Sequence, residues 1–334
     1  MAQRQDWRPW ALAGAAALAA GAGYTAWTSA RARVEQPPQG RFLAVDGVRL
    51  HYLEAGPPEA PAIVLLHGNV VDARDWLQSG VLQRLAETHH VIAFDRPGCG
   101  YSRRPRDRLW APRAQARAIA AGMEALGLGP AVVAGHSVGV QTALNLALDH
   151  PERVRALALL SGYYFPTLRL DSLAVGLQAA PVVGDLLTHT LLRPIGRLAS
   201  PLVAAQMFAP QKPPSGFLKR PFELSLRPAQ IHAYSADGFL MLLEARRLAQ
   251  RYRELRLPIV AAAASEDLIV DPREQSQRFA AAVEARFIDL GPAGHMAHHA
   301  APERVAEAIL DLAEASTSGM AQDQAPGELR PQAL

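Results

Sequence analysis

The chain has 334 residues, of which 49% are hydrophobic and 19% charged, so it can bury a sizeable core and is not globally disordered. Its 34 basic and 31 acidic residues give a formal net charge of +3, a balance too even for a dedicated nucleic-acid-binding protein. Cys99 is the single cysteine, which excludes an intrachain disulfide and a cysteine-based zinc site.

The first 40 residues differ in composition from the rest of the chain. No charged residue occurs between Pro9 and Ala30, and about 20 uncharged residues suffice to cross a bilayer as a helix. The run is mostly Ala and Gly, but it exceeds the roughly 7–15 residues of a usual signal-peptide core. We predict an uncleaved single-pass anchor that makes the membrane a partner, with export after signal-peptide cleavage as the alternative. Gln36–Gly40 is a predicted linker.

The middle of the chain begins with a hairpin and continues with alternating strands and helices. Arg41–Val45 and Arg49–Glu54 flank Asp46-Gly47, a strong two-residue turn signal. Helical spacing is clearest in Ala114–Leu126 and Val138–Asp149. Short apolar runs, typical of strands buried on both faces of a parallel sheet, are Ala62–Leu66, Val91–Phe94, Ala131–Ala134, Ala156–Leu160, Ile259–Ala263 and Arg286–Leu290.

This alternation predicts an α/β fold, with a mostly parallel central sheet and helices on both faces. It is interrupted between residues 163 and 256, where the sequence is helical in character and rich in proline. We expect a helical cap there, inserted into a core made of residues 41–162 and 257–315; an independent helical domain is the alternative. Residues 316–334 lack apolar periodicity and are predicted to be a disordered tail.

A G-H-S-V-G motif at residues 135–139 connects the strand predicted at Ala131–Ala134 to a helix. In the order strand, sharp turn and helix, this pattern indicates a nucleophilic serine. The turn strains the serine backbone, so Gly135 and Gly139 leave the room that it needs. The amino-terminal end of the following helix favours negative charge nearby. Ser137 is therefore the candidate nucleophile.

A serine hydroxyl needs a base that removes its proton as it attacks. His295 is the candidate base, because it follows the last predicted strand and precedes the last helix. His298 and His299 are nearby alternatives, and we expect them to begin or flank the closing helix. His136 adjoins the serine, but adjacent side chains on a tight turn point apart.

The base in turn needs a carboxylate that fixes its tautomer and stabilises the imidazolium. Asp267 follows the predicted strand Ile259–Ala263, and the order serine, aspartate, histidine matches this architecture. Glu266, Asp271 and Asp289 are the alternatives.

Acyl transfer also requires backbone N–H donors for the negative oxygen of the intermediate. We expect Val138 N–H, directly after the nucleophile, to be one donor. Asn69 N–H, in the loop after the third strand, is our choice for the second. Gly68 allows a close backbone approach there, and we interpret His67 as a hydrogen-bonding brace.

Residues from about 41 to 315 resemble the α/β-hydrolase fold superfamily, in the branch with an inserted cap. The resemblance rests on residues 67–69 (H-G-N), 95–102 (D-R-P-G-C-G-Y-S), 135–139, Asp267 and 294–295 (G-H). It implies a working enzyme with a Ser137, Asp267 and His295 triad. Members that attack epoxides or haloalkanes use an aspartate nucleophile, so a serine favours acyl chemistry. The loop 95–102 is interpreted as structural, with its cysteine packed rather than reactive.

We therefore expect a serine hydrolase that cleaves a carboxylic ester through an acyl-enzyme, without metal or organic cofactor. A carbon–carbon bond hydrolase or a cofactor-free haloperoxidase-like enzyme would use the same triad, and a non-catalytic membrane-associated protein is a third possibility. Apolar cap segments suggest an apolar acyl substrate, unless they merely form the cap's own core; they are 173–177, 182–187, 198–208 and 239–243.

Overall fold

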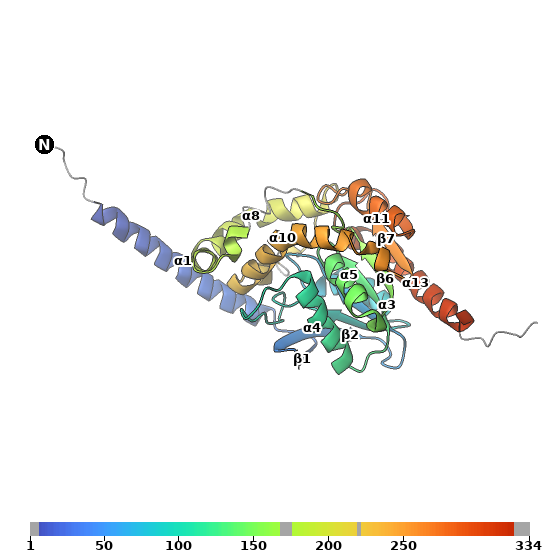
Figure 1. Ribbon diagram of the computed structural model, residues 1–334. Coiled ribbons are helices and arrows are strands. Elements are labelled where there is room, and N and C mark those ends of the chain that lie inside the picture. Colours follow the sequence, from blue (N-terminus) through green and yellow to red (C-terminus); the bar gives the residue numbers. More distant parts are fainter. Residues whose placement is uncertain (1–6, 168–175, 219–221, 324–334) are drawn as a thin grey trace, which may run out of the picture.

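A computed structural model describes residues 7–167, 176–218 and 222–323 of the chain. Its centre is an eight-stranded sheet in the order β1-β2-β4-β3-β5-β6-β7-β8 (Figure 1). β2 pairs antiparallel with both β1 and β4, and the other neighbours are parallel. The strands are β1 Arg41–Val45, β2 Val48–Ala55, β3 Ala62–Leu66, β4 His90–Phe94, β5 Ala131–His136, β6 Val154–Leu160, β7 Ile259–Ala263 and β8 Arg286–Asp289. The predicted fold class is confirmed.

The hairpin turn and the strand burial follow from residue type. Asp46 and Gly47 have φ angles of 49° and 73°, the left-handed pair that a tight two-residue hairpin turn requires. Along β3, Val64 and Leu66 join one apolar core, while Ile63 and Leu65 join the core on the opposite face. The continuous apolar run is therefore explained by burial on both faces of the sheet.

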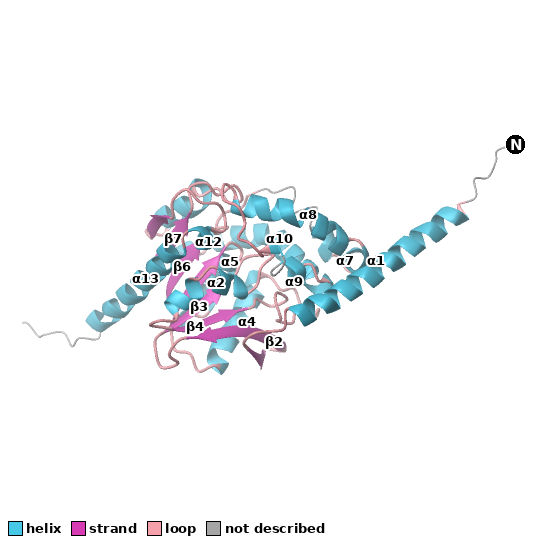
Figure 2. Ribbon diagram, turned by 180° about the vertical axis from the view of Figure 1, so that it is seen from behind, coloured by secondary structure: helices cyan, strands magenta, loops and turns pink. Residues whose placement is uncertain are grey.

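Helices cover both faces of the sheet (Figures 1 and 2). α4 (Pro112–Ala125), α5 (Gly139–Asp149) and α11 (Arg278–Ala282) contribute to one core. α3 (Val81–Leu85) and α13 (Pro302–Asp323) contribute to the other. The shorter elements are α2 Arg74–Gln78, η1 Pro151–Arg153, η4 Tyr252–Glu254, η5 Arg273–Gln277 and α12 Ala297–Ala300.

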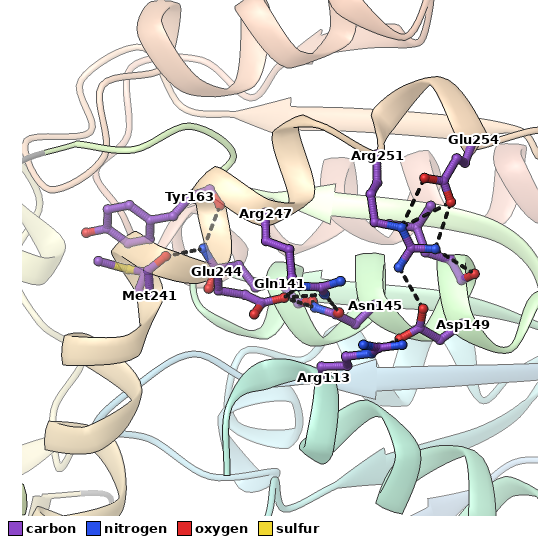
Figure 3. A network of polar contacts seen from close by, with 11 residues as sticks. Arg113, Gln141, Asn145, Asp149, Tyr163, Met241, Glu244, Arg247, Arg251 and Glu254 are labelled. Atoms are coloured by element: carbon purple, nitrogen blue, oxygen red, sulfur yellow. Dashed lines mark hydrogen bonds and ion pairs between the residues drawn. The ribbon is translucent and has the colours of Figure 1, made fainter. Parts of the chain in front are cut away.

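The described residues between β6 and β7 form helices and loops, as expected of a cap. They are η2 Leu177–Ala179, α7 Val183–Thr190, α8 Leu192–Phe208, α9 Glu223–Ser225 and α10 Pro228–Ala249. Polar contacts fix α10 to α5, the helix that follows the G-H-S-V-G motif (Figure 3). Gln141 Nε2 donates to the Met241 carbonyl at 3.0 Å, and Asn145 Nδ2 donates to Glu244 at 2.7 Å. α10 is thereby held directly above the motif.

The predicted membrane anchor is wrong. Residues Arg8–Glu35 do form one helix, α1, but among the described residues no helix is both long and apolar enough to cross a bilayer. The physical reason is composition, because alanine and glycine contribute little apolar surface. Polar residues of α1 are also among those buried: Thr28 is 3% exposed and accepts a 2.6 Å hydrogen bond from Arg193 of α8. Figure 2 shows the first half of α1 projecting from the body and the second half lying beside α7.

The predicted disordered tail is wrong over its first part. α13 continues beyond Leu312 as far as Asp323, so residues 316–323 are helical. Side-chain hydroxyls of Ser316 and Thr317 donate to the Ala313 carbonyl, which satisfies these polar groups within the helix. Residues 324–334 lie outside the described part of the chain.

Candidate active site

Ser137 lies in the sharp turn between β5 and α5. Its φ angle is 55°, a left-handed conformation that is strained for a residue with a side chain. The flanking glycines are sterically required. A Cβ on Gly139 would lie 2.5 Å from the Leu66 carbonyl oxygen, and one on Gly135 would lie 2.9 Å from the Gly139 oxygen. The backbone therefore has the elbow geometry that the motif predicts.

The structure brings the three predicted catalytic side chains together from distant parts of the sequence. His295 Nε2 lies 2.9 Å from Ser137 Oγ, and His295 Nδ1 lies 2.8 Å from Asp267 Oδ2. All three residues are at most 6% exposed. The cap side of the sheet thus holds a serine, an imidazole and a carboxylate connected by two hydrogen bonds.

The surroundings of Asp267 keep it ionised and fix the imidazole tautomer. Burial favours the neutral acid, but His295 and the Val270 and Ile269 N–H groups outweigh it and lower the pKa of Asp267. Both N–H groups donate to Oδ1, at 2.9 and 2.8 Å. Because Oδ2 accepts from His295 Nδ1–H, Nε2 is left unprotonated toward the serine hydroxyl. The imidazole is therefore oriented to accept the Ser137 proton.

The loop after β3 lies against the serine. A Cβ on Gly68 would lie 3.1 Å from Ser137 Cβ, a contact tight enough that a larger residue would press on the serine. His67 is the expected brace, because its Nε2 accepts from Arg96 N–H at 3.0 Å and its Nδ1–H donates to the Gly68 carbonyl at 2.7 Å. The expected donors, Asn69 N–H and Val138 N–H, have no acceptor among the described residues. Both are free to serve an incoming oxygen.

Arg96 is the principal feature that sequence reasoning missed. It is 0% exposed, and its guanidinium donates to the loop at His67 O (2.9 Å), Gly68 O (3.1 Å) and Asn69 Oδ1 (2.8 Å). Its two remaining N–H groups donate to Gln115 Oε1 and Asp237 Oδ2, at 2.9 and 2.7 Å. All five guanidinium donors are therefore used, and three of them hold the loop that carries Asn69.

The other histidines lie outside the serine's hydrogen-bonding shell. His136 Nε2 donates to the His295 carbonyl at 3.0 Å. His298 and His299 each contact a carboxylate oxygen of Asp75 at 2.7 Å. Within the described residues, the ligand atoms of this last group gather closely enough to hold a metal ion, within 4.8 Å of one another. Both histidines already use these atoms to contact the Asp75 carboxylate. The sequence did not predict this cluster.

Apolar side chains surround the three residues. Val138, next to the serine, packs with Tyr163, Met241 of α10 and Val270. Met296, next to the histidine, packs in a cluster with Val71, Met207, Phe208, Phe217 and Phe222. Of the apolar cap segments in the sequence, 198–208 and 239–243 therefore contribute at Met207, Phe208 and Met241, whereas Leu198 and Leu243 are exposed. Residues 173–175 of the first segment lie outside the described part of the chain.

Cys99 is 2% exposed in the loop between β4 and α4, and burial raises the pKa of its thiol to about 12. It is a packing residue, as the sequence indicated.

Comparison with known proteins agrees with this geometry. A family model described as alpha/beta hydrolase fold matches residues 61–302. Epoxide hydrolase A of Mycobacterium tuberculosis is 30% identical over 227 residues, which are 61% of this chain and 69% of that protein. A 2-hydroxymuconate semialdehyde hydrolase of Pseudomonas sp. is 36% identical over 135 residues, 39% of this chain and 46% of that protein.

Among solved structures, a thermophilic esterase from Thermogutta terrifontis superposes with a TM-score of 0.67 at 20% identity, covering 83% of this chain and 99% of that one. This likeness concerns the fold. The chain spans between 31% and 69% of the length of curated relatives that it matches. Because the family model covers most of the chain, this protein belongs to the alpha/beta hydrolase fold family of enzymes.

Proposed function

We propose that this protein is a serine hydrolase that cleaves a carboxylic ester or related acyl substrate. The observation that carries the proposal is the pair of hydrogen bonds joining Ser137 Oγ, His295 and Asp267, 2.9 and 2.8 Å long, at a left-handed backbone turn. This arrangement supplies a nucleophile, a base with a free Nε2 and a carboxylate that stabilises the imidazolium.

The expected reaction has two stages. Ser137 Oγ attacks the carbonyl carbon while His295 Nε2 takes its proton, and the carbonyl oxygen becomes negative beside the Val138 and Asn69 N–H groups. The tetrahedral intermediate collapses, the imidazolium gives its proton to the leaving alcohol, and an acyl-serine remains. Water then attacks this ester with the same histidine as base, which releases the carboxylic acid and restores the serine.

The nucleophile distinguishes this chain from epoxide-opening chemistry, although one relative is an epoxide hydrolase. A carboxylate that opens an epoxide forms an ester, which water can hydrolyse. A serine that did so would form an ether, which the same water could not cleave. Ser137 therefore supports acyl transfer.

The cap supports an apolar acyl group. Val138, Tyr163, Met241 and Val270 are buried together beside the nucleophile, and two of them come from residues 163–256. We propose that this segment is a cap domain that closes the acyl site on the core formed by residues 41–162 and 257–315. Exclusion of water there would strengthen the hydrogen bonds to the oxyanion.

The test is hydrolysis of p-nitrophenyl esters with acyl chains of increasing length. We expect turnover that falls by about ten-thousand-fold or more in Ser137→Ala and His295→Ala. Ser79→Ala is the matched control and should keep full activity, because Ser79 is buried and its hydroxyl donates to the Trp76 carbonyl at 3.1 Å. Activity that survives in Ser137→Ala would contradict the proposal.

A carbon–carbon bond hydrolase is the second candidate, because a 2-hydroxymuconate semialdehyde hydrolase is among the relatives. The same serine and histidine would serve, with the proton delivered to carbon instead of to oxygen. Turnover of a dienoic diketone at a higher kcat/KM than any ester would favour this candidate.

A further inference from the structure

A large cavity of about 2000 Å³ lies away from the candidate active site. It is open to solvent on one side and is lined mainly by the second half of α1, the loop 98–110 and the cap helix α10, and neither Ser137, Asp267 nor His295 lines it. One of its walls, α1, precedes residues 61–302, which match the family model. Residues 98–110 and α10 lie within the matched residues, so the cavity is formed where α1 meets the hydrolase fold.

The charge of the cavity wall is one-sided. No aspartate or glutamate occurs among the described residues that line it, although the whole chain has almost as many acids as bases. Three of its arginines are paired with carboxylates behind the wall, at Asp237, Asp185 and Asp46. Seven arginines line the cavity: Arg33, Arg49, Arg103, Arg104, Arg106, Arg108 and Arg227.

Arg227 is the most unusual of these arginines. It is 6% exposed, and its guanidinium donates to the Leu224 and Gly100 carbonyls and lies over the Tyr101 ring. No carboxylate of the described residues forms an ion pair with it. Burial above all, with some effect of the nearby positive Arg33, lowers the pKa of Arg227 to about 10. A buried cation without a counter-ion is costly, and an anion in the cavity would remove that cost.

Three further lining arginines have no carboxylate within ion-pair distance among the described residues: Arg33, Arg49 and Arg103. Arg49 lies over the Phe42 ring, 4.5 Å from its centroid. Arg33 on α1 and Arg103 on the loop are both exposed, so their side chains can move toward a ligand. Planar guanidinium groups bind carboxylate and phosphate oxygens in pairs, which makes such a set suited to an oxyanion.

The rest of the wall is mostly apolar, although Thr25, Ser29, His189, Gln230 and His232 also line it. Ala22, Ala26 and Ala30 follow one another at four-residue spacing along α1, a smooth strip about 12 Å long at 1.5 Å per residue. Phe239 and Leu243 of α10 also line the cavity, and they are 47% and 62% exposed. A ligand that covered them would bury apolar surface which the protein otherwise leaves in water.

We propose that this cavity binds an amphiphile, a small molecule with an alkyl chain and an anionic phosphate or carboxylate head group. The alkyl chain lies between α1 and α10, and the head group is bound by Arg33, Arg103 and Arg227. The site is separate from the catalytic serine, so the proposal stands independently of the hydrolase reaction.

Isothermal titration calorimetry on the full chain carrying Ser137→Ala tests this, with probes kept below the concentrations at which they form micelles. The probes are dodecyl phosphate, dodecanoate, dodecanol and inorganic phosphate. We expect the two anionic amphiphiles to bind at least tenfold more tightly than dodecanol or inorganic phosphate, and the tighter of the two identifies the head group. Absent binding, or equal binding of dodecanol, would overturn the proposal.

Variants locate the binding. The double variant Arg33→Gln with Arg103→Gln should bind dodecyl phosphate at least tenfold more weakly. The pair Arg41→Gln with Arg286→Gln removes the same charge from exposed sites elsewhere and should leave the affinity unchanged. Ala26→Trp should fill the apolar strip and abolish binding, whereas Ala19→Trp on the exposed part of α1 should not. If the two arginine double variants bound dodecyl phosphate equally well, or if the two tryptophan variants did, the ligand would not bind in this cavity.

Discussion

Arg96 and Asp237 form a fully buried ion pair of 2.7 Å between the loop after β4 and the cap helix α10. The carboxylate of Asp237 also binds Arg104, again at 2.7 Å, so one cap residue forms ion pairs with two guanidinium groups of the core. Because Arg96 in turn holds the backbone of His67 and Gly68, the position of the loop that carries Asn69 is linked to the docking of α10. Removing Asp237 would leave the buried guanidinium of Arg96 without a carboxylate, whereas removing Arg96 would leave Asp237 paired with Arg104.

This link makes Arg96→Lys a sharp test of the loop. Lysine keeps the charge but has one donor atom, so it cannot hold His67, Gly68 and Asn69 together. We expect kcat for p-nitrophenyl ester hydrolysis to fall by about 10- to 100-fold, with KM changed less, because the oxyanion donors act mainly in the transition state. Steady-state kinetics measures both constants.

Arg113→Lys is the control for this variant. Arg113 pairs with Asp149 at 2.6 Å on the surface and is 61% exposed, so kcat and KM of the Arg113→Lys variant should match those of the unmodified protein. If Arg96→Lys kept full kcat while remaining folded by circular dichroism, Arg96 would have no role in positioning the loop.

Met241 should set the length of the acyl chain. Its side chain packs beside Val138 in the apolar cluster next to Ser137, so Met241→Trp would reduce the space for an acyl group. We expect kcat/KM for an octanoate ester to fall by about tenfold or more relative to the acetate ester. Leu243→Trp, on the exposed side of the same helix, should leave this ratio unchanged. A ratio unaffected by Met241→Trp would place the acyl group elsewhere.

Two glycines in helices should respond in opposite ways to substitution by alanine. At Gly139, the added Cβ would lie 2.5 Å from the Leu66 carbonyl oxygen, so we expect a loss of about 3 kcal/mol in the free energy of unfolding. At Gly238, inside α10, no atom lies within 4 Å of the added Cβ. Gly238→Ala should therefore stabilise the protein by about 0.5–1 kcal/mol. Urea denaturation measures the free energy of unfolding of both variants. If Gly139→Ala left it unchanged, the tight turn described around Ser137 would be contradicted.

Asp75 should contribute stability in a pH-dependent manner. Burial favours its neutral form, but His298 and His299 outweigh this and hold the pKa of Asp75 well below its usual value. A depressed pKa in the folded state stabilises the protein fully above the unfolded value of about 3.9, and the contribution is lost as the pH falls further. Asparagine offers one acceptor oxygen for two histidine N–H groups, so Asp75→Asn should cost about 2–3 kcal/mol at pH 7.

Denaturation curves at several pH values test this prediction. The difference between the unmodified protein and Asp75→Asn should be present at pH 5 and should shrink below about pH 4, where the carboxylate of the unfolded chain takes up a proton. Asp311→Asn is the control, because Asp311 is 58% exposed and lies 3.6 Å from its arginine partner. A difference that did not shrink below about pH 4 would contradict the assigned ionisation of Asp75.

Much of the fold could be predicted because the signals are local. The apolar runs of β3 and β5, the Asp46-Gly47 turn and the G-H-S-V-G motif each specify their own geometry. The anchor predicted for the N-terminal segment was wrong because an uncharged helix crosses a membrane only if it also carries enough large apolar residues, and Pro9–Ala30 consists mostly of alanine and glycine. Its buried Thr28 could not be foreseen, since its partner Arg193 is 165 residues away.

In the candidate site, too, some residues could be predicted from the sequence and others could not. Ser137, Asp267 and His295 could be proposed from their positions at strand ends, because parallel strands bring those ends to one edge of the sheet. The Arg96–Asp237 pair could not, since 141 residues separate the partners and the pair exists only when α10 docks on the core. The Asp75 cluster depends on a similar long-range contact, across 223 residues to His298.

A fluorophosphonate probe followed by peptide mass spectrometry tests the central claim most directly, because such probes label only an activated serine. We predict one covalent adduct on Ser137, loss of ester hydrolysis in proportion to labelling, and no adduct in Ser137→Ala. A folded protein that takes up no label at Ser137, or that hydrolyses esters equally well when this serine is blocked, would contradict the account.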